Sequence, residues 1–259
     1  QKTAYEIPKR DWSSDVCSSD LAIPYFIDNE INSPNIDINQ LNNSDCEIAI
    51  IPHTYGFPVD LDKVKTKFII EDCCQSLGSY YKDNHTGLYG DVAVFSFYVS
   101  KIITSGGQGG MIVSKDKCLV DKIKNYRDFD MKTDKIGRFN FQMTEIQASI
   151  GRVQLSKLPT FLQKRKKIFD KYKNAGLELE LPNNNSIQNN YRVILKTNNS
   201  LDVLSKLKNN NIKSIVPIEE NELLDKTPNS VLYSNTTISL PIYPKLTNSQ
   251  LNKIIKTLI

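Results

Sequence analysis

Short apolar segments separated by polar turns recur along the first half of the chain. They comprise residues 23–28, 47–54, 67–73, 92–98 and 110–115. Several are continuous apolar runs rather than strict alternations, which is the pattern of strands covered on both faces in a parallel sheet. Residues 58–65, between the second and third segments, favour a short helix. The repeated strand–helix–strand order predicts an α/β fold with a mostly parallel sheet.

Longer helical patterns appear in the second half of the chain. Thr144 and Gln147 have the spacing of a capping box, and apolar residues follow at helical spacing. A second helix is predicted over residues 160–175, with Pro159 at its start and Gly176 after its end. The remaining elements are a loop (183–190), a strand (191–197), a helix (201–209), two strands (212–218 and 237–242) and a final helix capped by Thr247. Together they predict a smaller C-terminal α/β unit.

The composition excludes several classes of protein. With 39% hydrophobic and 24% charged residues, a chain of 259 residues can build a core, so wholesale disorder is excluded. A net charge of +4 gives no reason to expect nucleic acid, and no apolar run has the roughly 18–20 residues that a membrane span needs. Two histidines leave little room for a His-rich metal site, so we expect no metal. Five cysteines, two of them adjacent, make a poor disulfide framework and predict a cytoplasmic protein.

Residues 1–20 differ in style from the rest of the chain. They have neither helical nor strand periodicity, lack the pattern of a signal peptide, and contain Trp12, the only tryptophan. The run RDWSSDVCSSDL resembles a translated sequencing adapter. Our hypothesis is that this segment is not native and that the natural protein starts further upstream. The alternative is a native disordered tail.

Two polar residues follow the third apolar segment. Asp72 stands at its carboxyl end, where the ligand-binding crevice of an open α/β sheet lies. The alternative is that Asp72 caps a following helix. Gln75 comes three residues later, where one helical turn would place it beside Asp72.

A lysine follows the next strand. Ser96 ends that strand, and Lys101 comes five residues later, before the glycine-rich residues 106–110. Neighbouring isoleucines predict partial desolvation, which favours the neutral amine that can form a Schiff base. The alternative is an ordinary surface lysine. The glycines match neither a P-loop nor a dinucleotide-binding fingerprint, because the residues that must follow them are missing.

Four ordered motifs resemble the DegT/DnrJ/EryC1/StrS family of pyridoxal-phosphate-dependent aminotransferases of nucleotide-sugar metabolism. They are EDCCQSLGS (71–79), GDVAVFSFYVSK (90–101), GGQGGMIV (106–113) and GRFNFQMTEIQASIGRVQLSKL (137–158). The resemblance implies the fold type I, aspartate-aminotransferase-like architecture. It divides the chain into the non-native segment 1–20, the remainder of a large cofactor-binding domain (21–140), and linking helices with a small C-terminal domain (141–259).

The resemblance also implies a role for each matching residue. Lys101 matches the lysine that binds pyridoxal phosphate and moves protons, and Asp72 matches the carboxylate that bonds the pyridinium nitrogen. Gln75 matches a glutamine near the ring oxygen, and Ser96 matches a serine that bonds the phosphate. Asn140 matches an asparagine that reaches the phosphate from the neighbouring subunit. A homodimer with shared active sites is therefore expected.

The implied function is transfer of an amino group from an amino acid, expected to be glutamate, to a nucleotide-linked keto sugar. Such a reaction serves the biosynthesis of surface polysaccharides or glycoconjugates. One alternative is a sugar dehydratase of the same family, in which histidine replaces the residue matching Lys101. Another is a truncated, catalytically impaired member, because the family's upstream phosphate-binding helix start is not visible. His53, in HTYG, resembles a position lining the crevice, and a purely structural histidine fits it equally.

Overall fold

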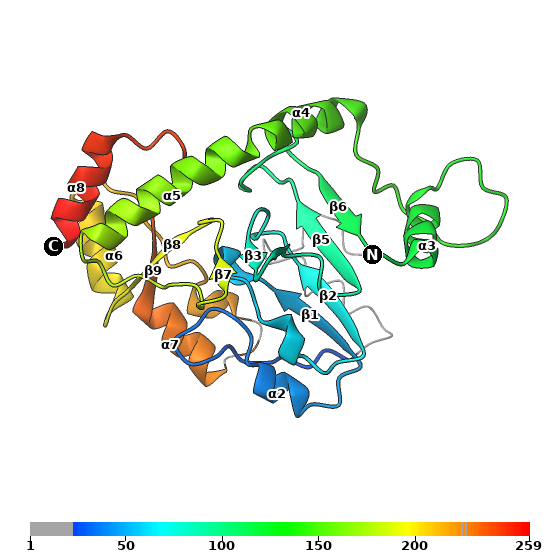
Figure 1. Ribbon diagram of the computed structural model, residues 1–259, viewed down its shortest axis with the longest axis horizontal. Helices are drawn as coiled ribbons and strands as arrows, with labels where there is room; N and C mark the ends of the chain where they lie inside the picture. The colour runs from blue at the N-terminus through cyan, green and yellow to red at the C-terminus, as the bar shows by residue number, and fades with distance from the viewer. Residues whose placement is uncertain (1–22, 224, 226) are drawn as a thin grey trace.

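The computed structural model describes residues 23–223, 225 and 227–259. The hypothesis of a non-native segment at residues 1–20 therefore lies outside the described residues. Within them, a four-stranded sheet and a smaller two-stranded sheet are bridged by long helices (Figure 1). No helix of the described chain combines the length and the apolar character that crossing a bilayer requires.

The larger sheet carries the strand ends where the candidate residues stand. Its strand order is β1 (Ile48–Pro52), β2 (Phe68–Asp72), β5 (Val92–Ser96) and β6 (Gly110–Val113). The first three strands run parallel, and β6 pairs antiparallel with β5. The prediction of a mostly parallel sheet is thus confirmed.

One face of this sheet packs on a small apolar core. Ala49 and Ile51 of β1 are buried against Ile38 and Leu41 of the short helix α2 (Ile38–Asn42). The alternate residues of β1 remain exposed. The prediction of strands covered on both faces is therefore wrong for β1, because its residues alternate between a buried and an exposed side.

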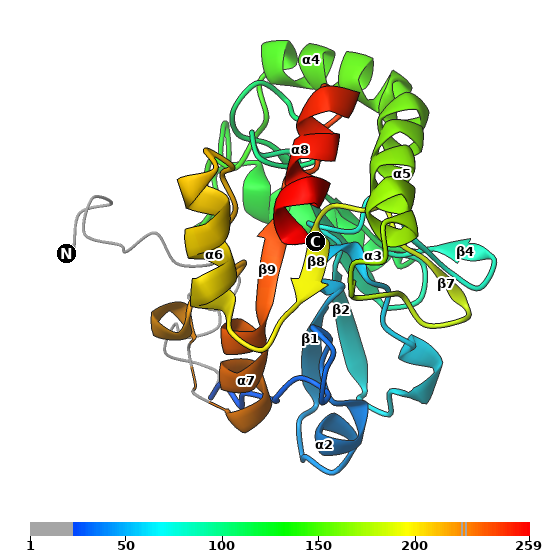
Figure 2. The same ribbon diagram turned by 90° about the vertical axis from the view of Figure 1, so that its left-hand side faces the viewer.

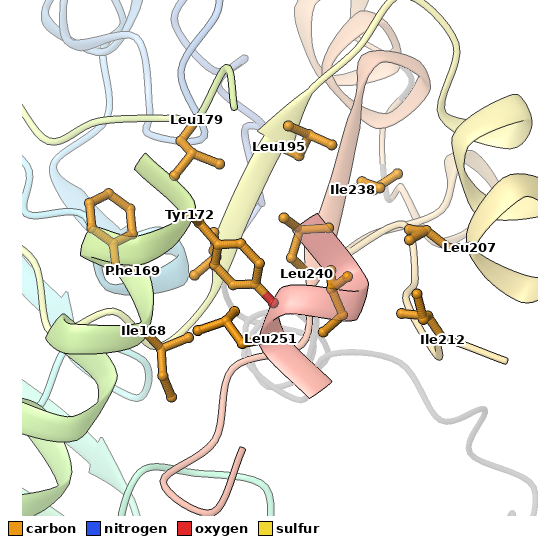
Figure 3. Close-up of a cluster of buried hydrophobic side chains, with 12 residues drawn as sticks. Ile168, Phe169, Tyr172, Leu179, Leu195, Leu207, Ile212, Ile238, Leu240 and Leu251 are labelled. Carbon is orange, nitrogen blue, oxygen red and sulfur yellow. The ribbon is translucent and has the colours of Figure 1, made fainter. Parts of the chain in front are cut away.

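A second core lies in the C-terminal part of the chain. Strands β8 (Val193–Lys196) and β9 (Thr237–Leu240) pair antiparallel. Helices α5 (Leu158–Asn174), α6 (Ser200–Asn209) and α8 (Asn248–Leu258) surround this pair (Figure 2). The buried side chains of these elements form one apolar cluster (Figure 3).

Tyr172 is the largest side chain of this cluster. It is fully buried, and its hydroxyl donates to the carbonyl of Pro241 at 3.0 Å, so its polar atom is satisfied. Desolvation raises the pKa of this phenol above its ordinary value. The cluster therefore packs the two-stranded sheet against the helices, and the Tyr172 hydroxyl inside it keeps a hydrogen-bond partner.

The predicted helix ends are confirmed. Thr144 caps α4 (Glu145–Ser156) and Thr247 caps α8, each in a reciprocal capping box with the glutamine three residues later. Gly176 follows α5 with a φ of +81°, a conformation that glycine adopts at low cost. The cap residues alone thus located these helices to within a residue or two.

Some elements were not predicted. Helices α3 (Lys117–Arg127) and α7 (Pro228–Thr236) were missed, as was a small antiparallel sheet. That sheet contains β3 (Tyr80–Tyr81), β4 (Asn84–His85) and β7 (Ser186–Ile187), so part of the predicted loop 183–190 is paired.

Three predicted elements are wrong. Residues 23–28 join no sheet, and Pro24 offers no N–H for one. Residues 212–218 make only one bridge, from Ile215 to Ser239, and Pro217 again removes a donor. The helix expected over 58–65 is reduced to a single 3₁₀ turn, Leu61–Lys63.

Asp28 caps α7 from 200 residues away along the sequence. Its carboxylate accepts the Thr227 hydroxyl at 2.6 Å and the N–H groups of Asn229 and Ser230 at 2.9 and 3.0 Å. We expect Asp28→Ala to lower the free energy of unfolding by about 1–2 kcal/mol, because the orphan N–H groups of the helix lose their acceptor. Urea denaturation would measure this loss against Asp45→Ala, an exposed control. Equal stability of the two variants would contradict the capping role.

Candidate active site

The carboxyl ends of β1, β2 and β5 lie side by side at one edge of the larger sheet. His53 follows β1, and its N–H donates to the carbonyl of Asp72 at 3.1 Å. The N–H of Cys73 donates to the carbonyl of Val94 at 2.9 Å, so β2 and β5 stay paired to their ends. Asp72 and Ser96 are thereby carried on neighbouring strands, two residues out of register. In parallel sheets this edge is where ligands bind.

Asp72 is half-buried and held by a local turn. Its Oδ1 accepts the N–H of Cys74 at 2.9 Å. No helix follows it in the structure, so the alternative that Asp72 caps a helix is wrong. An ionised carboxylate has further lone pairs, and Asp72 can accept a donor from a ligand as well.

Gln75 is fixed by a neighbouring loop. Its Oε1 accepts the N–H of Tyr55 at 2.8 Å, and this bond leaves the amide NH₂ available as a donor. Tyr55 itself has a φ of +57° in the turn after β1. The expected helical turn between Asp72 and Gln75 is replaced by a run of tight turns.

Lys101 lies in the loop that joins β5 to β6. Backbone bonds close this loop, from Phe97 N–H to Gly109 O at 2.8 Å and from Val99 N–H to Gly107 O at 3.1 Å. Lys101 is half-buried, and its Nζ lies 5.8 Å from the centroid of the Tyr191 ring. The lysine is therefore not the fully solvated surface residue of the alternative reading.

The electrostatics of Cys74 connect Asp72 with Lys101. Burial raises the pKa of the Cys74 thiol, the negative charge of Asp72 raises it further, and the positive charge of Lys101 opposes them. Both charged groups therefore influence the same half-buried thiol. The adjacent Cys73 has its pKa raised to about 12, by burial and by the charge of Glu71. All cysteines among the described residues are free thiols.

His53 is buried, with 1% of its side chain exposed, and both of its ring nitrogens are engaged. Nδ1 accepts the N–H of Val59 at 3.0 Å, so Nε2 carries the proton and lies 3.0 Å from Glu71 Oε2. This neutral tautomer has no free nitrogen to offer a ligand. The geometry thus fits the structural histidine better than a residue lining the crevice.

Glu71 is the buried partner of His53. Burial by itself raises the pKa of Glu71, but the hydrogen bonds from His53 and from the N–H groups of Gly90 and Gly87 outweigh it and hold that pKa below its ordinary value. His53, Glu71 and Cys73 place potential metal ligands within 4.8 Å of one another. Since their polar atoms are already paired and the thiol stays protonated, we assign this cluster to the architecture of the strand ends.

Ser96 and Asn140 are placed differently. The Ser96 hydroxyl, at the end of β5, accepts the N–H of Tyr98 at 3.3 Å and can still donate. Asn140 is exposed in the connection between α3 and α4. No hydrogen bond or ion pair of the described chain joins it to Asp72 or Lys101. Its predicted action from a second subunit stays a prediction.

Sequence reasoning missed the segment from Asn189 to Arg192. The Tyr191 ring lies beside both Lys101 and Arg192, and Asn189 donates to the carbonyl of Gln75. Before the fold is known, the letters NNYR give only a polar loop entering a strand.

The comparisons with known proteins agree on one family. The model of the DegT/DnrJ/EryC1/StrS aminotransferase family matches residues 14–259. GDP-perosamine synthase of Escherichia coli O157:H7 is 34% identical over 59% of this chain and 45% of its own length. GDP-perosamine synthase of Vibrio cholerae is 27% identical over 90% of this chain and 72% of its own length. The chain thus spans between about half and three quarters of these relatives.

Solved structures share the fold. The aminotransferase TlmJ from Streptoalloteichus hindustanus superposes with a TM-score of 0.85 at 19% identity, covering 94% of this chain and 74% of its own. A DegT DnrJ EryC1 StrS aminotransferase from Brucella abortus gives 0.81 at 22% identity, covering 92% and 73%. The predicted fold type I architecture is thereby confirmed.

Proposed function

The chain belongs to the DegT/DnrJ/EryC1/StrS aminotransferase family, and from this premise we propose that it moves an amino group from an amino acid, glutamate in the first instance, to a nucleotide-linked keto sugar. The observation that carries the proposal is the placement of two half-buried groups at one edge of the larger sheet, with Asp72 at the end of β2 and Lys101 in the loop that follows the neighbouring strand β5. The names of the relatives support a sugar acceptor. They include perosamine synthases and a UDP-N-acetyl-3-dehydro-alpha-D-glucosamine 3-aminotransferase of Acidithiobacillus ferrooxidans.

The residues at this edge suit pyridoxal phosphate, the cofactor of the family. The amine of Lys101 would hold it, the Asp72 carboxylate would accept a hydrogen bond from its ring nitrogen, and the free NH₂ of Gln75 would donate to its ring oxygen. The Ser96 hydroxyl would donate to its phosphate. When bound, the cofactor supplies an electron sink for negative charge at the amino donor's α-carbon.

The protein's own groups then have distinct tasks. The hydrogen bond that Asp72 accepts from the Cys74 N–H orients its carboxylate, which would accept a hydrogen bond from the protonated ring nitrogen. The amine of Lys101 would also move a proton to or from the α-carbon of the donor. The Tyr191 ring covers the amine of Lys101 and limits the access of water.

A homodimer belongs to the proposal. Helix α4 has no buried residue, and Ile146 at its start is 75% exposed. Phe141, beside Asn140, is 67% exposed. A second copy of the chain packed on this apolar surface would bury these side chains and bring Asn140 toward the partner's phosphate site. Of the two reactions in the family, Lys101 favours transamination over dehydration.

The proposal predicts that the purified protein binds pyridoxal phosphate with a visible absorption band. Borohydride should fix the cofactor onto Lys101, which peptide mapping would locate. Glutamate should then remove the band, and a panel of nucleotide-linked keto sugars should include one that restores it. A folded protein that shows no band with the cofactor would refute the function.

A further inference from the structure

Arg192 is a partly buried cation without an acidic partner. Over residues 23–223, 225 and 227–259, no carboxylate lies within ion-pair distance of its guanidinium. Nη1 donates to Ser239 Oγ at 3.2 Å, while Nε is shielded from water and makes no hydrogen bond. A buried donor without an acceptor is costly, so the site is short of an anion or another acceptor.

Aromatic rings connect this cation to the candidate active site. The Arg192 Cζ lies 5.7 Å from the centroid of the Tyr191 ring, and the Lys101 Nζ lies 5.8 Å from the same centroid. The centroid of the Tyr55 ring is also 5.7 Å from Arg192 Cζ. The backbone N–H of Tyr55 donates to Gln75 Oε1, so this ring is tied to the site as well. Arg192 is thus one aromatic ring away from the amine of Lys101.

Asn189 holds the segment that carries Arg192 in place. This side chain is 2% exposed, and its Nδ2 donates to the carbonyls of Gln75 and Leu77 at 2.8 and 3.0 Å. Its Oδ1 accepts the N–H of Tyr191 at 2.9 Å. A side chain at Gly56 would place its Cβ 2.0 Å from that oxygen, so the close approach requires glycine there. The position of Arg192 is therefore preorganised relative to the loop after Asp72.

We propose that, in the transamination proposed for this chain, Arg192 binds a carboxylate of the amino-acid donor. The planar guanidinium suits a carboxylate, and the rings of Tyr55 and Tyr191 limit water around it. In an amino acid, one carboxylate is attached directly to the carbon at which Lys101 moves a proton. The phosphates of a nucleotide sugar are separated from the reacting carbon by the sugar ring. A cation beside the same aromatic ring as Lys101 is therefore better placed for the donor's carboxylate than for those phosphates.

The test compares Arg192→Gln and Arg192→Lys with the parent protein loaded with pyridoxal phosphate. Succinate, an unreactive dicarboxylate, is titrated by calorimetry, and glutamate is titrated through the loss of the cofactor's absorption band. We expect R192Q to weaken succinate binding by about 10- to 100-fold and to raise the glutamate concentration needed for half of the band loss by a similar factor, while cofactor affinity is unchanged. R192K keeps the charge and should recover part of the loss. Lys213→Gln removes an exposed charge nearby in sequence and should change neither value.

Two results would overturn this assignment. Unchanged succinate and glutamate binding in R192Q would remove Arg192 from donor recognition. Weaker binding of a nucleoside diphosphate or of the cofactor, with donor binding intact, would assign the guanidinium to a phosphate instead. If the parent protein shows no cofactor band, the proposed function itself fails. That result is separate, because calorimetry with succinate on the protein without cofactor still tests whether Arg192 binds a carboxylate.

Discussion

Replacement of Lys101 by alanine is expected to lower turnover by about a thousandfold or more, and to remove the covalent attachment of the cofactor altogether. The reason is that one amine has two tasks in the proposed reaction, holding the cofactor and moving the proton at the donor's α-carbon. Among the described residues, Lys101 is the lysine whose amine lies beside an aromatic ring of this site, 5.8 Å from the centroid of Tyr191. The backbone of its loop is closed by bonds that do not involve the side chain, so the variant should fold.

The measurement combines activity with mass spectrometry after borohydride reduction. Lys167→Ala, an exposed lysine on α5, is the matched control and should keep both activity and attachment. Transamination retained by K101A at the parent's rate would refute the role. Added small amines that restore part of the activity would support proton transfer as the lost step.

Sequence patterns located the residues that depend on strand ends. Asp72 and Ser96 each follow an apolar run, and such a run fixes where a parallel strand stops and which edge its last residue reaches. Lys101 was identifiable because it ends the motif GDVAVFSFYVSK, and the resemblance of that motif to the family implies its role. The helix caps at Thr144 and Thr247 could also be recognised from local sequence, because a capping box spans only four residues.

Other features depend on contacts that no local pattern encodes. The bond from Asn189 to Gln75 spans 114 residues, and it holds the segment in which Tyr191 lies beside both Arg192 and Lys101. The same holds for Asp28, whose helix begins at residue 228. The predicted strands that the structure lacks have a simpler explanation. An apolar run that contains proline, such as 212–218, lacks the N–H groups that a ladder needs.

Alternation along β2 separates two carboxylates with opposite environments. Asp72 lies at the candidate site, and its neighbour Glu71 is directed to the buried side, where it is 0% exposed. Glu71 accepts four hydrogen bonds, from the His53 ring and from the N–H groups of Gly87, Tyr89 and Gly90. The position of Asp72 therefore depends on a buried anion one residue away.

We expect Glu71→Gln to lower the free energy of unfolding by about 2–4 kcal/mol at neutral pH. An amide has one oxygen for the four donors, and its NH₂ would face N–H groups that are themselves donors. The pKa of Glu71 is held below its ordinary value of 4.5 in the folded protein, so its ionised form contributes stability that is fully present above that value. As the pH falls through the lower folded pKa, the carboxyl is protonated and this contribution is lost. The deficit of E71Q should therefore be largest at neutral pH and should shrink in acid.

Urea denaturation at neutral pH and at a series of values falling below pH 4.5 would measure both parts of this expectation. Glu47→Gln is the control, because Glu47 and its partner Lys67 are exposed and such a pair contributes little. A variant E71Q as stable as the parent at neutral pH would contradict the buried anion. If the difference in unfolding free energy between E71Q and the parent stays constant as the pH is lowered, the loss would instead be due to packing. If the anion orients Asp72, cofactor affinity should fall together with stability in E71Q and stay unchanged in E47Q.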